Sequence, residues 1–240
     1  MGMRLIGPVY LVGGQDFNMV YLDWPANDCN AYLVDTGDTL VMFDCGCGES
    51  LSGILGNIRE MSFDLHDLSH VFLTHAHIPH CGAAEDLRRN QVEVVASAQT
   101  AAAVRAGGLA TVAYHYHRHF TPVEQVTEMA DGEEITIGAC AIKAFQAPGH
   151  SADSTAYVVT HEGRRMLFCG DVVRAPSIDQ FRNRPDYDRA AYLETLTRLL
   201  NDPPMVLYPG HGPFCVSKPE HWIGEEIKKL LAAPHCRQER

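Results

Sequence analysis

The 240-residue chain predicts an α/β protein in which helices cover layers of β-sheet. Three observations support this prediction. Each half of the chain runs through several strand-like segments and then through a helical one. Apolar residues make up 46% of the chain, which is enough for a large core. No linker-like tract, low-complexity segment or internal repeat separates the two halves, so we expect one domain over residues 1–240.

The first half predicts mainly strands. Residues 30–34 and 39–43 are apolar and flank a turn-rich tetrapeptide, which indicates a β-hairpin. Apolar residues recur at helical spacing in residues 52–62, which indicates a helix. The nearly continuous apolar run at residues 70–74 is typical of a strand buried on both faces. The remaining expected elements are a helix at 83–90, a strand at 92–96 and helical pieces within 98–119.

The second half repeats the pattern of strands followed by helices. Expected strands lie at residues 134–137, 141–145, 155–159, 165–169 and 205–208. Expected helices lie at residues 190–200 and 222–232, where apolar side chains share one side. The two halves therefore build similar layers, which favours a layered sandwich over two separable domains.

Charge and composition exclude several classes of partner. Lys plus Arg is 19 and Asp plus Glu is 30, a net charge of −11, and no basic cluster is present, so nucleic acid is not an expected partner. No apolar run approaches the roughly 20 residues of a membrane span. The first residues lack the apolar core of a signal peptide, which predicts a cytoplasmic protein. The eight cysteines fit small, reduced core residues, although Cys45, Cys47 and Cys81 lie close to the motifs below.

Three histidines follow the apolar run at residues 70–74. They are His75, His77 and His80. On an extended or turning backbone, side chains at i and i+2 point the same way, so His75 and His77 can bind one ion together. Imidazole is a ligand for Zn, Fe, Cu or Ni rather than for Mg or Ca. This segment therefore predicts a transition-metal site.

Three further polar residues stand at glycine-containing corners directly after expected strands. They are His150 in Pro-Gly-His, Asp171 in Gly-Asp, and His211 in Pro-Gly-His-Gly. Glycine allows the backbone to turn sharply, and functional residues often lie on loops at strand ends. The four corners together present five histidines and one aspartate.

The order HxHxxH, PGH, GD and PGHG resembles the metallo-β-lactamase superfamily, which includes glyoxalase II, lactonases and persulfide dioxygenases. The resemblance spans nearly the whole chain. It implies the family fold, a four-layer αββα sandwich of two mixed β-sheets flanked by helices, with the metal site at one edge of the sheets.

The resemblance also implies roles for individual residues. The matched metal ligands are His75, His77 and His150 at a first site, His80 and His211 at a second, and Asp171 between the two. Asp44 matches an aspartate that hydrogen-bonds a ligand histidine.

One position departs from the family pattern HxHxDH. Pro79 stands where the pattern has an aspartate, and proline offers neither a ligand nor an N–H. The first site keeps three imidazoles and a carboxylate, which is a complete set for zinc. The second site loses one negative charge and should bind a dication more weakly. We therefore predict one zinc ion per chain, with a second site that is weak or completed by a substitute ligand such as Cys81.

Two other groups of residues are candidates for the substrate pocket. His115, His117 and His119 alternate along the chain and could share one face of an extended segment. The resemblance places them in a variable insertion that often covers the site. Tyr187, in the stretch that follows Asp171, could also reach a substrate. A solvated loop is the alternative reading for both groups.

Three hypotheses about function remain open. The first is a hydrolase of a small ester, thioester or lactone, in which a metal-bound hydroxide attacks the carbonyl and Asp171 or His211 accepts a proton. The second is a mononuclear iron oxygenase of the persulfide-dioxygenase type, with His75, His150 and Asp171 as a facial triad. The third is a catalytically degenerate metal-binding protein. We favour the hydrolase, with a small-molecule substrate and a homodimer as the default assembly.

Overall fold

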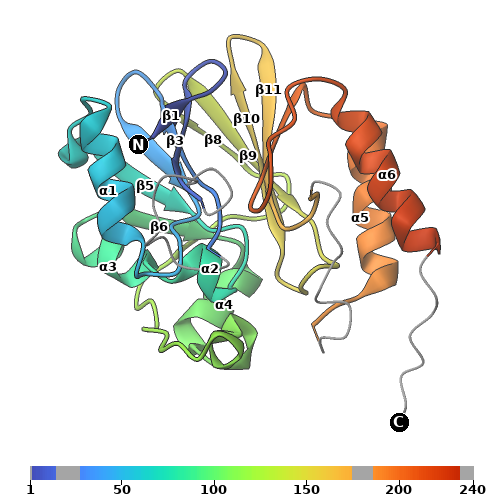
Figure 1. Ribbon diagram of the computed structural model, residues 1–240, viewed down its shortest axis with the longest axis horizontal. Helices are drawn as coiled ribbons and strands as arrows, with labels where there is room; N and C mark the ends of the chain where they lie inside the picture. Colours follow the sequence, from blue (N-terminus) through green and yellow to red (C-terminus); the bar gives the residue numbers. More distant parts are fainter. Residues whose placement is uncertain (1, 15–27, 175–185, 233–240) are drawn as a thin grey trace.

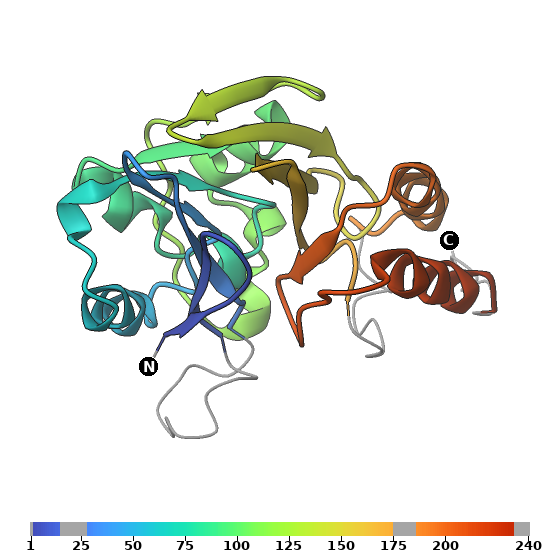
Figure 2. The same ribbon diagram turned by 90° about the horizontal axis from the view of Figure 1, so that it is seen from above.

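The computed structural model describes residues 2–14, 28–174 and 186–232. In these residues two β-sheets pack face to face, and helices cover the outer face of each sheet (Figure 1). The view from above separates the layers, with α1 to α4 on one side of the two sheets and α5 and α6 on the other (Figure 2). The predicted αββα sandwich is therefore confirmed.

The first sheet joins the strands of the first half in sequence order. Its strands are β1 (Met3–Arg4), β2 (Val9–Gly13), β3 (Ala31–Asp35), β4 (Leu40–Phe43), β5 (Leu68–Phe72), β6 (Glu93–Ala96) and β7 (Thr127–Glu128). The strands pair antiparallel from β1 to β4 and parallel from β4 to β7. The parallel part places the carboxyl ends of β4, β5 and β6 at one edge of the sheet.

The second sheet has the order β12-β11-β10-β9-β8. Its strands are β8 (Glu134–Ile137), β9 (Cys140–Gln146), β10 (Thr155–His161), β11 (Arg164–Gly170) and β12 (Val206–Pro209). The strands from β8 to β11 pair antiparallel, and β12 joins β11 in parallel. The sheets are therefore both mixed, as expected.

Helices follow the strands that they cover. The α-helices are α1 (Leu51–Glu60), α2 (Ile78–Cys81), α3 (Ala84–Arg89), α4 (Ala98–Ala106), α5 (Arg189–Asn201) and α6 (Pro219–Ala232). Short 3₁₀ turns are η1 (Leu65–Asp67), η2 (Leu109–Thr111) and η3 (Ala113–Tyr116). Among the helices of the described ranges, none is long and apolar enough to cross a bilayer.

Alternation along the central strands explains why they are apolar on both faces. In β4, Val41 and Phe43 point into the core between the two sheets, whereas Leu40 and Met42 point into the core under the helices. The ring of Phe43 stacks on Phe168 of the second sheet, with centroids 4.0 Å apart. Burial of large apolar side chains in these layers is the main term that stabilises the sandwich.

Several short elements differ from the expectations. The strands β1 and β7 and the helix α2 had no clear sequence pattern, because two-residue strands and a four-residue helix are too short to show a period. The five-residue strand β2 was also not among the expected elements. The strand expected at residues 70–74 is β5, which begins at Leu68 and ends at Phe72. This earlier end leaves Leu73 and Thr74 as a connection into the histidine motif. The single-domain expectation stays a prediction.

Candidate functional site

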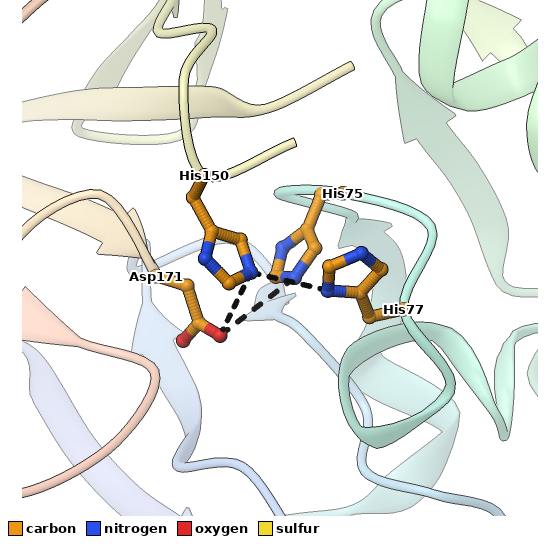
Figure 3. A group of neighbouring side chains, drawn as sticks. All are labelled: His75, His77, His150 and Asp171. Atoms are coloured by element: carbon orange, nitrogen blue, oxygen red, sulfur yellow. Dashed lines mark hydrogen bonds and ion pairs between the residues drawn. The ribbon is translucent and has the colours of Figure 1, made fainter. Parts of the chain in front are cut away.

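Six residues that could ligate a metal ion meet at one edge of the sandwich. His75 and His77 follow β5, His80 lies in α2, and His150, Asp171 and His211 follow β9, β11 and β12. They form two groups whose ligand atoms lie within 4.8 Å of one another: His75, His77, His150 and Asp171 in the first, and His80, Asp171 and His211 in the second. Figure 3 shows the first group, in which His75 and His77 from the connection after β5 converge with His150 and Asp171 from two other loops.

The first group is buried and tight. Nε2 of His150 lies 3.1 Å from Nδ1 of His77 and 3.3 Å from Oδ2 of Asp171. Nε2 of His75 lies 3.9 Å from the same carboxylate oxygen. All four residues are buried. Three nitrogens and one oxygen thus converge on one point.

The second group shares Asp171 through its other oxygen. Oδ1 of Asp171 lies 3.4 Å from Nε2 of His80 and 3.8 Å from Nε2 of His211. His80 is buried, but the side chain of His211 keeps 24% of its surface exposed. His211 is therefore the ligand residue on the solvent side of the cluster.

Unsatisfied polar atoms test whether the cluster fits a metal ion. Nε2 of His75, Nε2 of His80 and Oδ1 of Asp171 are buried and make no hydrogen bond within the described residues. Buried polar atoms normally have partners, and an orphaned one calls for an explanation such as an ion. Imidazole nitrogens with one carboxylate are also a donor set that zinc or iron accepts. The residues present therefore fit a metal ion.

Burial and neighbouring charges perturb the titration of the cluster. Burial and the nearby histidines hold the pKa of His75 well below its ordinary value. Burial alone would raise the pKa of Asp171, but Arg174 and the surrounding histidines outweigh it and the pKa lies well below the usual range. Burial likewise opposes protonation of His80, yet Asp171, Cys29 and Asp44 raise its pKa well above normal. Without a metal the carboxylate of Asp171 is thus ionised and His80 carries a proton, which metal binding must displace.

Asp44 contacts the ring nitrogen of His80 that does not face Asp171. Its Oδ2 lies 2.8 Å from Nδ1 of His80 and accepts a hydrogen bond from the hydroxyl of Thr74, while Oδ1 accepts from the Thr74 N–H at 2.8 Å. The contact expected between Asp44 and a ligand histidine is therefore present. It leaves Nε2 of His80 facing Asp171. Thr74 was not among the expected site residues.

Two further carboxylates support the first group. Asp186 places Oδ2 3.0 Å from Nε2 of His77, which leaves Nδ1 of that ring facing the cluster. Asp153 accepts a hydrogen bond from the N–H of Ala76, between the two ligand histidines, at 2.8 Å. Sequence reasoning missed both residues. Asp153 lies three residues after His150, but nothing in the local pattern indicates that either side chain reaches the histidine motif.

The departure at Pro79 leaves the local backbone helical. Pro79 lies in the first turn of α2, where its missing N–H removes no intrahelical hydrogen bond. The thiol of Cys81 donates to the carbonyl of Ala76 at 3.0 Å, and Cys81 is in neither ligand group. The cysteine whose sulfur lies close to His80 is Cys29. Its sulfur is within 4.8 Å of ligand atoms of Asp44 and His80. The structure therefore does not place Cys81 as the substitute ligand.

The other cysteines fit the expectation of small core residues. The seven described cysteines are free and buried, and Cys236 lies outside the described residues. Burial raises the pKa of Cys29 and Cys169 to about 12 and that of Cys47 to about 11. These thiols are therefore protonated at neutral pH and poorly reactive.

The second histidine cluster is not extended. Residues 113–116 form the 3₁₀ turn η3, and His117 has a left-handed φ of 52°, so the three histidines do not alternate on a strand. His115, His117 and His119 are exposed and belong to neither metal group. Tyr187 packs edge-on against Tyr192 of α5, at a centroid distance of 6.1 Å. Substrate contact by any of these residues stays a prediction.

Comparison with known proteins finds matches over most of the chain. A family model described as the metallo-β-lactamase superfamily matches residues 24–211. An atrochrysone carboxyl ACP thioesterase from Emericella nidulans is 28% identical over 203 residues, covering 84% of this chain and 57% of that protein. The thioesterase pkgB of the same organism is 25% identical over 209 residues, covering 85% of this chain and 53% of that protein. The chain thus spans little more than half the length of these relatives.

Solved structures agree on the fold. A B3 metallo-β-lactamase described as the first with an active site glutamic acid is 25% identical, with a TM-score of 0.75 over 96% of this chain and 88% of that one. The Rm3 metallo-β-lactamase is 21% identical, with a TM-score of 0.76 over 96% of this chain and 91% of that one. Such similarity extends over nearly the whole chain.

Proposed function

Because the chain belongs to the metallo-β-lactamase superfamily, we propose that it is a metal-dependent hydrolase that cleaves thioesters. The observation that carries the proposal is the buried group of three histidines and Asp171, whose ligand atoms converge without hydrogen-bond partners for Nε2 of His75 and Oδ1 of Asp171. The relatives named as thioesterases support a thioester over an ester or a lactone.

The residues that would hold the ion are those of the first group, His75, His77, His150 and Asp171. A divalent zinc ion held there supplies Lewis acidity, which lowers the pKa of water toward neutrality and polarises a carbonyl. The buried histidines exclude bulk solvent from one side of the centre, and the low local dielectric strengthens charge interactions there.

Neither of the two candidate proton acceptors in the cluster, Asp171 and His211, is a strong base. The pKa of Asp171 lies well below the ordinary range, so its carboxylate is a weak proton acceptor at neutral pH. Burial lowers the pKa of His211, although Asp171 opposes this, so its imidazole is neutral. Its side chain also keeps access to solvent. A pKa lowered to about 3 makes this imidazole a weak base as well. We therefore propose that the proton passes to solvent on the side of the cluster where His211 is partly exposed.

The test is an anaerobic thioesterase assay. Protein stripped of metal is reloaded with zinc or with iron(II), and thiol release from a short acyl thioester is followed without O₂. We expect zinc-loaded protein to release thiol, and His150→Ala, which removes a ligand of the first group, to lose at least about 100-fold in rate. Arg165→Met, which removes an arginine near the start of β11 that pairs with Asp202, serves as the control. Thiol consumption only with iron and O₂ would instead establish the oxygenase.

A further inference from the structure

Arg174 contacts Asp171, the carboxylate that the two candidate ligand groups share. Arg174 follows Asp171 by three residues, and its Nη2 donates to Oδ2 of that carboxylate. The side chain is 10% exposed. The same oxygen lies 3.3 Å from Nε2 of His150 and 3.9 Å from Nε2 of His75, so the guanidinium contacts the carboxylate at the face that serves the first ligand group.

The charges of the described residues favour one divalent ion over two. Asp171 and Asp44 each contribute a negative charge, and Arg174 contributes a positive one, while ligand histidines are neutral when they bind a metal. At the carboxylate shared by the two groups these charges sum to a single negative charge, since the carboxylates of Asp186 and Asp153 contact His77 and Ala76 instead. One divalent ion makes the centre modestly positive, and a second adds two more positive charges with no further carboxylate, because position 79 is proline.

Distance alone does not prevent a second ion. The ligand atoms of His80, Asp171 and His211 lie within 4.8 Å of one another, and Nε2 of His80 and Oδ1 of Asp171 are buried without hydrogen bonds in the described part of the chain. A dication placed in this group would share Asp171 with the guanidinium of Arg174. Two cations that share one carboxylate in a buried site repel each other. Electrostatics therefore decides the occupancy of this group.

We propose that Arg174 takes the place of a second divalent ion, so that the centre binds one metal ion and one fixed guanidinium on the shared carboxylate. The arginine neutralises Asp171 through Oδ2, and the carboxylate then keeps too little negative charge to hold a second dication through Oδ1, the oxygen that faces His80. This proposal rests on the metal binding assumed in the proposed function, but not on the reaction that the centre performs.

Metal stoichiometry tests the proposal without an activity assay. Metal-free protein is titrated with Zn²⁺ against a chromophoric chelator, and bound zinc is counted by elemental analysis after gel filtration. We expect one tightly bound zinc per wild-type chain. Arg174→Met keeps the apolar stem but removes the charge, and should strengthen binding of a second zinc by at least about tenfold. Arg174→Lys keeps the charge and should retain single occupancy.

Two further variants keep the result interpretable. Arg165→Met removes an arginine that pairs with Asp202 at 2.6 Å on the surface, and should leave zinc binding unchanged. Pro79→Asp adds a carboxylate in the first turn of α2, and combined with Arg174→Met it should bind the second zinc more tightly than either single variant. Cobalt substitution gives an independent count, because the visible spectrum changes when a second ion binds.

The outcomes separate this proposal from the proposed function. Two tightly bound zinc ions in the wild-type protein, or unchanged second-zinc affinity in folded Arg174→Met, would overturn the role of Arg174 and leave a hydrolase intact. A wild-type protein that binds no metal would overturn the metal centre itself, and with it both proposals. One zinc in the wild type and a stronger second site in Arg174→Met support the proposal.

Discussion

Replacing Asp186 with alanine is expected to weaken metal binding while leaving the fold nearly as stable. Oδ2 of Asp186 lies 3.0 Å from Nε2 of His77, so the carboxylate holds the proton on Nε2. Nδ1 of His77 is then left without a proton and faces the ligand cluster, 3.1 Å from Nε2 of His150. Without Asp186, His77 can also adopt the tautomer with the proton on Nδ1, which cannot bind a metal through the nitrogen that faces the cluster.

The size of the effect follows from the exposure of the pair. Carboxylate partners of metal-binding histidines typically contribute 10- to 100-fold in metal affinity, or about 1.4 to 2.8 kcal/mol. The side chain of Asp186 is 26% exposed and that of His77 is 4% exposed, so solvent screens part of the interaction. We therefore expect roughly a tenfold loss of zinc affinity and a change of less than about 1 kcal/mol in the free energy of unfolding of the metal-free protein.

Two measurements check this prediction. Zinc affinity is obtained by competition with a chelator, and the tautomer of His77 is obtained from long-range ¹H–¹⁵N spectra of histidine-labelled protein. Asp186→Asn retains a neutral acceptor and should lose less affinity than Asp186→Ala. Asp188→Ala is the matched control two residues further on, because Oδ1 of Asp188 caps α5 by accepting from Ala190 and Ala191 N–H at 2.8 and 3.0 Å.

The control should show the opposite pattern. Loss of the helix cap in Asp188→Ala should destabilise the fold by about 1 kcal/mol and leave zinc affinity unchanged. An Asp186→Ala protein with wild-type zinc affinity and an unaltered His77 spectrum would refute the reasoning.

Three other substitutions test the support of the site and the core. Asp153→Ala leaves the Ala76 N–H without its 2.8 Å acceptor and should cost about 1–3 kcal/mol by urea denaturation; an unchanged midpoint would contradict the contact. Arginine contacts lower the pKa of buried Glu85 to about 2, so its stabilisation is complete above pH 4.5 and fades as the pH falls toward 2. Glu85→Gln should accordingly lose roughly 3 kcal/mol at neutral pH and progressively less in acid, whereas a pH-independent difference would contradict the charge effect. Phe43→Ala removes a ring stacked on Phe168 and should cost about 3–5 kcal/mol in thermal unfolding monitored by circular dichroism, a smaller loss meaning that the core collapses around the cavity.

Most of the fold could be predicted from periodicity. The strands β3, β4, β6 and β8 to β12 and the helices α1, α3, α5 and α6 lie within a few residues of their expected positions. Alternating or continuous apolar residues report directly on whether one face or both faces of an element are buried. The elements that escaped prediction, such as β1 with two residues and α2 with four, are held by pairing and by neighbouring loops rather than by their own pattern.

The ligand residues themselves could be proposed from sequence because each stands at a recognisable strand end. His75, His150, Asp171 and His211 follow β5, β9, β11 and β12, and strand ends at one edge of a sandwich converge. The alternative of Cys81 as a substitute ligand lacks support for a related reason. Adjacency to His80 in the chain says little about side-chain direction on a helix, and the thiol of Cys81 is directed to the carbonyl of Ala76.

By itself, the sequence determined the layered fold and the set of histidines and aspartate that can bind a metal, because burial period and motif spacing are local properties. Only the tertiary structure decided which other charges surround them. Asp186 reaches His77 across 109 positions of the chain and Asp153 reaches Ala76 across 77. Arg174 is only three residues from Asp171, but the two side chains meet because the chain turns after β11 ends. Long-range polar contacts depend on how separate loops pack, and no pattern along the chain encodes that distance.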